Sequence, residues 1–552
     1  MLKTKLVSSL EKGFLDSDID SFENFSGTAI LRKERLSFQL MYTYDEESDP
    51  ARSMYKLSIT GDLSDYADAR EVKCVPVYTP GYVFDDNYLR TSPGLYPDLL
   101  EPLHYDGTIS VIKNQLHSIW IDIDTRKAKE KIASGIHILD ISLCEGDKKV
   151  ASHQIQIEVL DASLPAQTLY LTQWFHCDCL ANYYNCEVWS ERHWEIIENF
   201  AATAKSNGIN LILTPVFTPP LDTGIGGERL TTQLVDVIKR GDVYSFDFST
   251  LDRWIDMCDR VGIEYFEISH LFTQWGAAHA PKIMAHVDGD YRQIFGWDTD
   301  ATSEEYTDFL RKFLKSFLHH MRLRGDDERC FFHISDEPNT EQLESYRAAK
   351  DSISDLLEGY PIMDALSNYD FYKLGVVTTP IPSNDHIDKF IENNVPDLWT
   401  YYCCGQCVGV SNRLMAMPSW RNRSIGMQMY KYNIVGFLQW GFNFYNNMSS
   451  VDSVNPYVET SGDYWVPAGD AFSVYPSCDG HALESLRIVV FHEALQDMRA
   501  MQLCQTLCGR DTVIKTIENA FGKEIKFDKC AYSAKEIFAV RDAVNRLIKE
   551  NL

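Results

Sequence analysis

Residues 251–269 read Leu-Asp-Arg-Trp-Ile-Asp-Met-Cys-Asp-Arg-Val-Gly-Ile-Glu-Tyr-Phe-Glu-Ile-Ser. The first part carries apolar side chains at helical spacing, and the run 265–269 is a short apolar segment rich in strand-forming residues. We therefore expect a helix over about 251–261 that leads into a buried strand. A helix followed by a buried strand is the repeating unit of parallel α/β folds.

The same alternation continues on both sides of this stretch. Further helices are expected over 190–206 and 303–323, and strands are expected over 168–175, 209–214, 330–335, 361–364, 374–378, 398–402 and 434–440. About eight such units fit a (β/α)8 TIM-type barrel with long loops. A doubly wound sheet is the competing topology, but no G-x-G-x-x-G or Walker A motif follows a strand, so nucleotide-binding versions lose support.

The N-terminal part has a different pattern, with strict period-two alternation and no helices between the runs. Examples are residues 36–44, 55–59, 118–123, 135–141 and 154–160. Such strands bury one face and expose the other, which predicts an antiparallel β-sandwich.

The sequence therefore predicts a multidomain β plus α/β protein. A β-sandwich over residues 1–165, with Pro165 marking the linker, precedes a catalytic barrel over 166–510. From about residue 511 the sequence indicates a helical extension, 511–552, packed on the barrel.

Composition excludes several function classes. The chain has 552 residues, 45% of them apolar and 24% charged, which is ordinary for a globular protein of more than one domain. Lys and Arg total 52 against 80 Asp and Glu, so the net charge is −28. This charge repels phosphate backbones and anionic lipid, so nucleic acid is a poor candidate partner.

The expected location is the cytoplasm. The N-terminal stretch has no apolar run long enough for a signal peptide, and the chain has no segment of ~18 apolar residues for membrane insertion. The 14 Cys residues are then most simply reduced thiols. Neither of the Cys groups in residues 176–179 and 403–407 shows paired C-x-x-C knuckles at zinc-finger separation, so we interpret them as structural and expect no metal.

Polar and aromatic residues gather where the expected barrel strands end, which is where this fold places its active sites. Aromatic residues make up 12% of the chain, and acids, histidines and rings at one rim suit a polyhydroxylated sugar. The candidate sugar-binding residues are His176, Asp178, Asp222, Trp275, Tyr401, Trp440 and Tyr445.

Each of these residues also has a structural interpretation. Trp275 and Trp440 are sugar platforms or core residues, and Tyr401 donates to an acetamido oxygen or belongs to the rim. His176 and Asp178 either bind sugar hydroxyls or contact each other in the rim of the barrel. Asp222 either binds substrate or caps a helix. Arg487 lies on a predicted helix, where surface pairing is the favoured interpretation.

The sharpest element is Asp336-Glu337, directly after an apolar strand and directly before Pro338. Because neighbouring strand residues point to opposite faces, Asp336 and Glu337 reach one site only if the strand ends there. Pro338 ends the strand, since proline cannot continue a central ladder. Two crowded carboxylates do not ionise equally, which gives an acid beside a base. Glycoside hydrolysis needs such a division of labour.

Several long motifs occur around this pair in a characteristic order. They are residues 174–181, 208–223, 265–277 and 334–338, followed by 420–423 through 436–445. In these motifs the chain resembles glycoside hydrolase family 123, over about residues 170 to 500. The family consists of β-N-acetylgalactosaminidases with an N-terminal β-sandwich and a (β/α)8 catalytic domain. The resemblance implies a retaining exo-hydrolase that uses adjacent Asp and Glu residues, here Asp336 and Glu337, and needs no cofactor.

The resemblance also implies substrate-assisted catalysis through an oxazolinium ion. Asp336 then holds the 2-acetamido group of the substrate, and Glu337 acts as acid and later as base. Two alternatives stay open: a retaining β-glycosidase whose nucleophile is a late Glu such as Glu459 or Glu484, and a non-catalytic carbohydrate-binding protein. The partner in each case is an oligosaccharide or glycoconjugate. Its aglycone and linkage, the choice between N-acetylgalactosamine and N-acetylglucosamine, and the oligomeric state are not determined by the sequence.

Overall fold

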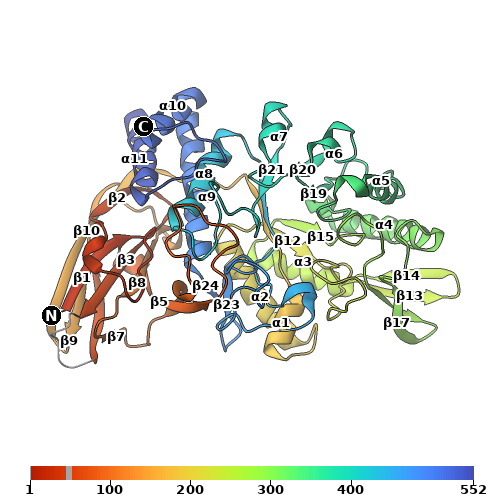
Figure 1. The fold of residues 1–552 in the computed structure, drawn as a ribbon, viewed down its shortest axis with the longest axis horizontal. Coiled ribbons are helices and arrows are strands. Elements are labelled where there is room, and N and C mark those ends of the chain that lie inside the picture. The colour runs from red at the N-terminus through yellow and green to blue at the C-terminus, as the bar shows by residue number, and fades with distance from the viewer. Residues whose placement is uncertain (1, 45–51) are drawn as a thin grey trace.

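The chain combines a sheet-rich N-terminal region with a larger region of alternating strands and helices, which lie on opposite sides of the molecule (Figure 1). The computed structural model describes residues 2–44 and 52–552. Met1 and residues 45–51, which fall in the predicted sandwich, lie outside the described residues. The multidomain β plus α/β class predicted from the sequence is confirmed.

Two five-stranded sheets build the N-terminal region in the described residues, in the orders β1-β3-β8-β5-β6 and β2-β10-β9-β4-β7. The strands are β1 (Leu2–Ser8), β2 (Gly27–Arg32), β3 (Arg35–Tyr44), β4 (Arg52–Gly61), β5 (Ala67–Val77), β6 (Gly94–Pro102), β7 (Thr108–Ile112), β8 (His117–Asp124), β9 (Gly135–Glu145) and β10 (Lys148–Ser163).

These two sheets share one hydrophobic core. Phe38 and Ile121 of the first sheet belong to the same buried cluster as Ile141 and Ile157 of the second. Pairing is antiparallel except between β10 and β2, which run parallel. The two strands are far apart in the chain, so no hairpin fixes their relative direction, and the expectation of a purely antiparallel arrangement is wrong at this one edge.

Eight short strands form the centre of the second region, within the part of the chain that the structure describes. They pair in parallel in three groups, β11-β22-β21, β12-β15-β18 and β19-β20. Their bounds are β11 (Tyr170–Gln173), β12 (Leu211–Thr214), β15 (Tyr265–Ile268), β18 (Cys330–Phe332), β19 (Met363–Ala365), β20 (Thr379–Ile381), β21 (Trp399–Tyr401) and β22 (Gly436–Gln439).

Single contacts connect these three groups. Parallel bridges join Phe332 to Ile362 and Ser383 to Tyr401. The backbone N–H of Asn210 donates to the carbonyl of Leu171 across 3.2 Å, beside β12 and β11. Each strand therefore has its neighbours in chain order, and the last strand pairs with the first.

The helices begin and end where local signals place them. Ser190 accepts from the N–H of His193 at the start of α2, Ser303 accepts from that of Tyr306 at the start of α4, and Gly262 ends α3 in the left-handed conformation. The helices are α1 (Cys177–Tyr184), α2 (Glu191–Ser206), α3 (Ser249–Val261), α4 (Glu304–Arg324), α5 (Leu343–Asp351), α6 (Tyr369–Lys373), α7 (Asp388–Glu392), α8 (Ser419–Lys431), α9 (Leu486–Cys508), α10 (Arg510–Phe521) and α11 (Ala534–Asn551). Among the described residues, no helix has the length and apolar character needed to span a membrane.

Two local expectations differ from the structure. The strand predicted at 374–378 is a turn after α6, and β20 begins only at Thr379. An additional sheet of order β14-β13-β16-β17 extends from the region (Figure 1). It consists of two hairpins inserted between the expected units: β13 (Asp236–Arg240), β14 (Val243–Asp247), β16 (Ile283–Val287) and β17 (Asp290–Phe295). A further hairpin, β23 (Val474–Pro476) and β24 (Ala482–Glu484), precedes α9.

Buried ion pairs join the two regions. Arg487 on α9 contacts Asp98 on β6 through two hydrogen bonds of 2.8 and 2.9 Å, and the Tyr475 hydroxyl donates to the same carboxylate across 2.6 Å. Arg487 is 2% exposed, so the expectation of a surface pair is wrong. The docking of β6 against α9 encloses this face of the helix, which the sequence of the helix alone does not reveal.

Replacing Arg487 should destabilise the protein strongly. In Arg487→Met the Asp98 carboxylate stays buried without its cation, which costs about 3–5 kcal/mol of unfolding free energy. Urea unfolding followed by circular dichroism measures the loss. The control is Arg192→Met, which removes a surface pair with Glu195 and should cost less than about 1 kcal/mol. Equal losses in the two variants would contradict a special role for the buried pair.

Candidate active site

Both carboxylates of the Asp336-Glu337 pair open onto one cavity of about 150 Å³ at the ends of the eight parallel strands. The cavity also brings together four of the candidate sugar-binding residues, Asp222, Trp275, Tyr401 and Trp440. The remaining lining residues are Trp174, Ala365, Cys403, Cys404, Leu438, Trp465 and Val466. Acids and aromatic rings from distant segments therefore surround one small space.

The backbone after β18 explains how adjacent residues share this cavity. The strand ends at Phe332, earlier than Pro338 alone suggests, so Asp336 and Glu337 lie in a loop. Glu337 has a left-handed backbone with φ of 41°, and its N–H donates to the carbonyl of Ala365 across 3.0 Å. This conformation removes the strand alternation that points neighbours to opposite sides.

Two other cavity residues also have left-handed backbones. Asp222 has φ of 49° and Trp275 has φ of 58°. The Asp222 N–H donates to the Gln274 side chain across 2.7 Å, and the Trp275 N–H donates to the Asp336 carbonyl across 2.8 Å. Unfavourable backbone conformations that the surroundings hold in place are typical of functional sites.

Three carboxylates influence one another in this cavity. Burial raises the pKa of Asp336 well above its usual range, and the negative charges of Glu337 and Asp222 raise it further. Burial, outweighing the opposing charge of Arg229, also raises the pKa of Asp222 to about 7, and the charge of Glu337 adds to this. The site therefore holds one carboxyl, Asp222, whose pKa is about 7 and a second, Asp336, whose pKa is raised well above its usual range, and such shifted carboxyls in a cavity are typical of acid–base sites.

Aromatic hydroxyl and indole groups fix the walls of the cavity. The Tyr401 hydroxyl donates to Oε1 of Glu337 across 2.6 Å. The indole N–H of Trp440 donates to Asp470 across 2.9 Å, and its ring lies 5.5 Å from that of Trp465. Glu337 and Trp440 thus have defined orientations.

Three candidate residues do not reach the cavity. His176 and Asp178 are buried and both contact Arg229, which donates to Asp178 twice across 2.8 Å and to Nδ1 of His176 across 3.3 Å. His176 in turn donates from Nε2 to the carbonyl of Trp440 across 3.0 Å, and burial lowers its pKa to about 4. The Tyr445 hydroxyl donates to the carbonyl of Val474 across 2.8 Å. His176 and Asp178, joined by Arg229, support the wall behind Trp440, and none of the three candidates lines the cavity.

A buried histidine network lies near the floor of the site. His333, three residues before Asp336, has Nε2 at 2.7 Å from Glu267 and Nδ1 at 3.1 Å from Asp364. Burial by itself lowers the pKa of His333, but hydrogen bonds to Asp364 and Glu267 raise it to about 9. His333 is therefore an imidazolium at neutral pH, and its charge opposes the upward shift in the pKa of Asp336.

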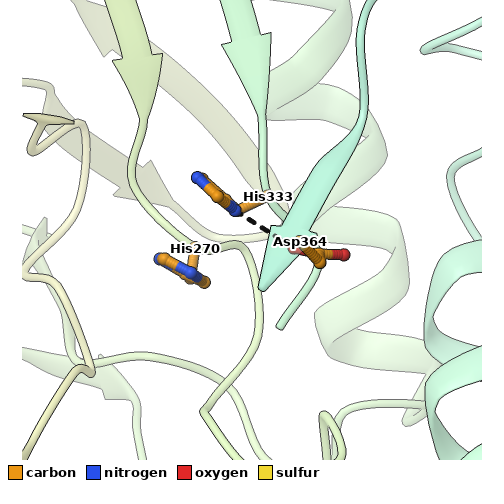
Figure 2. A group of neighbouring side chains, drawn as sticks. All are labelled: His270, His333 and Asp364. Atoms are coloured by element: carbon orange, nitrogen blue, oxygen red, sulfur yellow. Dashed lines mark hydrogen bonds and ion pairs between the residues drawn. The ribbon is translucent and has the colours of Figure 1, made fainter. Parts of the chain in front are cut away.

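The same network contains a histidine pair that resembles a metal site. His270, His333 and Asp364 lie close together, and Figure 2 shows the His333–Asp364 contact and the adjacent His270 ring. The two imidazole rings stack with centroids 4.2 Å apart and planes 15° apart. Stacked rings direct their in-plane nitrogens along parallel planes, whereas a metal needs them to converge at about 2.0–2.1 Å. Both nitrogens of His333 are also paired with carboxylates, so the residues favour an ionised histidine over a metal.

Seven lining residues were not among the sequence candidates, and four of these, Trp174, Cys403, Cys404 and Trp465, carry aromatic or thiol side chains. Trp174 directly follows β11, and Cys403 and Cys404 come two and three residues after β21, so the strand-end criterion that selected Tyr401 applies to them as well. The interpretation of residues 403–407 as purely structural did not anticipate this placement. Trp465 comes from a long loop after β22 and carries no periodic signal in the sequence.

Comparison with known proteins agrees with this geometry. Residues 174–504, more than half of the chain, match the family model described as "Glycoside hydrolase 123, catalytic domain". No curated protein matches the chain.

Among solved structures, a family 123 glycoside hydrolase from Clostridium perfringens, studied for glycolipid glycan hydrolysis, superposes with a TM-score of 0.75 at 17% identity. The match covers 100% of this chain and 98% of that chain. A family 39 glycoside hydrolase from Bacteroides cellulosilyticus has a TM-score of 0.31 at 8% identity, over 81% of this chain and 82% of that chain. A Bifidobacterium dentium β-glucuronidase has a TM-score of 0.33 at 9% identity, over 90% of this chain and 66% of that chain.

The ionised His333 predicts a stability difference that depends on pH. In His333→Gln, Glu267 and Asp364 lose their shared cation, which should cost about 3 kcal/mol of unfolding free energy near pH 6. Because the pKa of His333 is raised to about 9, its stabilisation is complete below pH 6.5 and is lost as the pH rises through about 9. Denaturant titrations from pH 6 to 10 should therefore show that the difference in unfolding free energy between wild type and variant becomes smaller as the pH rises.

His193 provides the matched control. It is also buried, but its Nε2 donates to the carbonyl of Cys177 across 2.9 Å and its Nδ1 accepts from the Trp189 N–H across 3.0 Å. Burial lowers its pKa below the 6.5 of an ordinary histidine, so it is neutral above about pH 7. The cost of His193→Gln should therefore stay constant from pH 7 to 10. A constant gap for His333→Gln as well would show that His333 is not charged.

Proposed function

The chain belongs to glycoside hydrolase family 123 and is an enzyme that acts on glycosides, and we propose that it releases terminal β-linked N-acetylgalactosamine as a retaining exo-hydrolase. In this proposal the eight parallel strands form a (β/α)8 barrel over residues 166–510, and the two N-terminal sheets form a β-sandwich over 1–165. Residues 511–552 are a C-terminal extension. The observation that carries the proposal is the adjacent pair Asp336 and Glu337 in one small aromatic cavity.

The alternative with a protein nucleophile has less support. Neither Glu459 nor Glu484 is among the residues that line the cavity. Glu484 accepts from Arg35 across 2.9 Å and also pairs with Arg70. Although burial opposes it, these two cations hold the pKa of Glu484 well below its usual range. This carboxylate stabilises the contact between the two regions, so the substrate itself is the better source of the nucleophile.

In the proposed mechanism the carbonyl oxygen of the 2-acetamido group attacks the anomeric carbon. The glycosidic C–O bond breaks, and Glu337 gives its proton to the leaving oxygen. With the proton of the Asp336-Glu337 pair on Glu337, Asp336 is a carboxylate that accepts a hydrogen bond from the acetamido N–H and opposes the positive charge of the oxazolinium ion. Water then attacks the anomeric carbon with Glu337 as base, which regenerates the acetamido group and gives retention.

The surrounding residues fit supporting tasks. The Tyr401 hydroxyl, 2.6 Å from Glu337, orients the acid/base carboxylate and lies within reach of the acetamido group. Trp275 and Trp440 offer ring faces to the C–H surface of a sugar. Asp222 offers a carboxylate to a sugar hydroxyl. Arg229, with His176 and Asp178, holds the wall behind Trp440.

The proposal predicts a specific response to Glu337→Gln. Natural glycans, which need leaving-group protonation, should be hydrolysed about 10²-fold more slowly. Substrates with a nitrophenol leaving group should lose less in the first step, and azide should partly rescue the second step, where the base is missing. Steady-state and burst kinetics on both substrates measure this. Equal losses without an azide response would assign Glu337 another role.

A second prediction separates substrate assistance from a protein nucleophile. Asp336→Asn should slow every N-acetylhexosaminide by ~10² or more, because each needs the oxazolinium ion and the amide lacks the opposing charge. The variant should also bind a thiazoline analogue of that ion less tightly, and azide should not restore its activity. Near-normal turnover and thiazoline affinity, or wild-type cleavage of glycosides without a 2-acetamido group, would contradict substrate assistance.

A further inference from the structure

Three exposed tyrosines lie next to the cavity and have no role in the mechanism above. Tyr78, Tyr82 and Tyr464 are 45%, 50% and 62% exposed. The rings of Tyr78 and Tyr464 have centroids 5.6 Å apart, and the Tyr82 hydroxyl donates to the carbonyl oxygen of Trp465. Trp465 lines the cavity, so these three residues, here named the tyrosine platform, are continuous with it.

The platform is built jointly by the two regions of the chain. Tyr78 and Tyr82 lie in the segment 78–93 between β5 and β6, whereas Tyr464 lies in the long loop after β22. The segment is firmly held: the Ala468 N–H donates to the carbonyl of Thr79 across 2.8 Å. Asp85 accepts from Arg421 across 2.9 Å and from the Gly409 N–H across 2.8 Å. The position of the tyrosines beside the cavity is therefore fixed by several contacts.

The size of the cavity indicates what lies on this platform. A volume of about 150 Å³ is well below the ~300–1,000 Å³ of pockets that enclose drug-sized ligands. Such a space suits a single sugar ring, so the group to which that ring is attached must extend past the mouth of the cavity. Trp465 lines the cavity and its carbonyl accepts from Tyr82, so the platform adjoins this part of the wall.

Building on the proposed function, we propose that the tyrosine platform binds the neutral saccharide on the leaving-group side of the cleaved bond. Tyrosine rings pack on the C–H faces of sugars, and the Tyr82 hydroxyl, which donates to Trp465, still has a lone pair that accepts from a sugar hydroxyl. The net charge of −28 of the chain disfavours an anionic sugar at this position. The N-terminal region thereby contributes directly to substrate choice.

The test compares substrates with and without a leaving-group saccharide. One substrate is N-acetylgalactosaminyl β-linked to lactose, and the other is N-acetylgalactosaminyl fluoride, whose leaving group is a single atom. For Tyr82→Ala and for Tyr464→Ala, the ratio of kcat/KM for the trisaccharide to that for the fluoride should fall about five- to tenfold. Tyr82→Phe, which keeps the ring, should preserve most of the ratio.

Tyr105→Ala is the matched control, because Tyr105 is 92% exposed and lies in the turn between β6 and β7. It should leave the ratio unchanged. An unchanged ratio in Tyr82→Ala and Tyr464→Ala would overturn the proposal. So would a loss confined to octyl N-acetylgalactosaminide, which would assign the platform to a lipid chain.

A binding measurement separates this inference from the proposed reaction. Lactose should perturb the tyrosine resonances of the wild-type enzyme in NMR titrations, and Tyr464→Ala should weaken that binding about fivefold or more. If the wild type cleaved neither substrate yet bound lactose in this way, the proposed reaction would fail while the platform stands. Cleavage of both substrates without lactose binding or a change in ratio would leave the reaction intact and overturn the platform.

Discussion

The burial of like charges is the constraint on which the site depends. Asp336, Glu337 and Asp222 share one small cavity, and removing such groups from water disfavours their charged forms. A buried cation partly offsets these charges, because His333 is held as an imidazolium between Glu267 and Asp364. Thr172 and Trp174 donate to the same Glu267, so strands β11, β15, β18 and β19 are tied together around this charge. The element that moderates the electrostatics of the site also joins its strands.

The two regions of the chain form the site together. Arg35 and Arg70 of the N-terminal sheets form ion pairs with Glu484 at the end of β24, and Arg487 of α9 forms an ion pair with Asp98. Buried pairs of this kind tolerate little displacement, since separating them leaves charges without partners. They fix β5 and β6 against the second region, and the segment between these strands reaches the cavity mouth. The N-terminal sheets therefore act on the geometry of the site as well as on stability.

Much of the site follows from one topological rule that is visible in the sequence. Parallel strands bring their carboxyl ends to the same edge, so polar residues after strands far apart in the chain converge. The rule selected Asp222, Trp275, Tyr401 and Trp440 together with the Asp336-Glu337 pair, and all of them line one cavity. The strands themselves were predictable because their apolar runs alternate with amphipathic helices, although β20 lies a few residues later than the pattern suggests. Family membership, predicted from the motifs, is confirmed.

What the sequence did not reveal depends on partners supplied from elsewhere in the chain. His176 and Asp178 follow a strand end as Asp222 does. Arg229 from a distant loop forms hydrogen bonds with both, so their side chains lie in the wall and not in the cavity. Arg487 has the pattern of a helix surface, and only the docking of β6 encloses it. Local patterns report which face of an element is apolar, and they do not report which polar groups will meet. For that reason the residues that are free to act on a substrate are the strand-end carboxylates that form no ion pair with the described residues, rather than all those at strand ends.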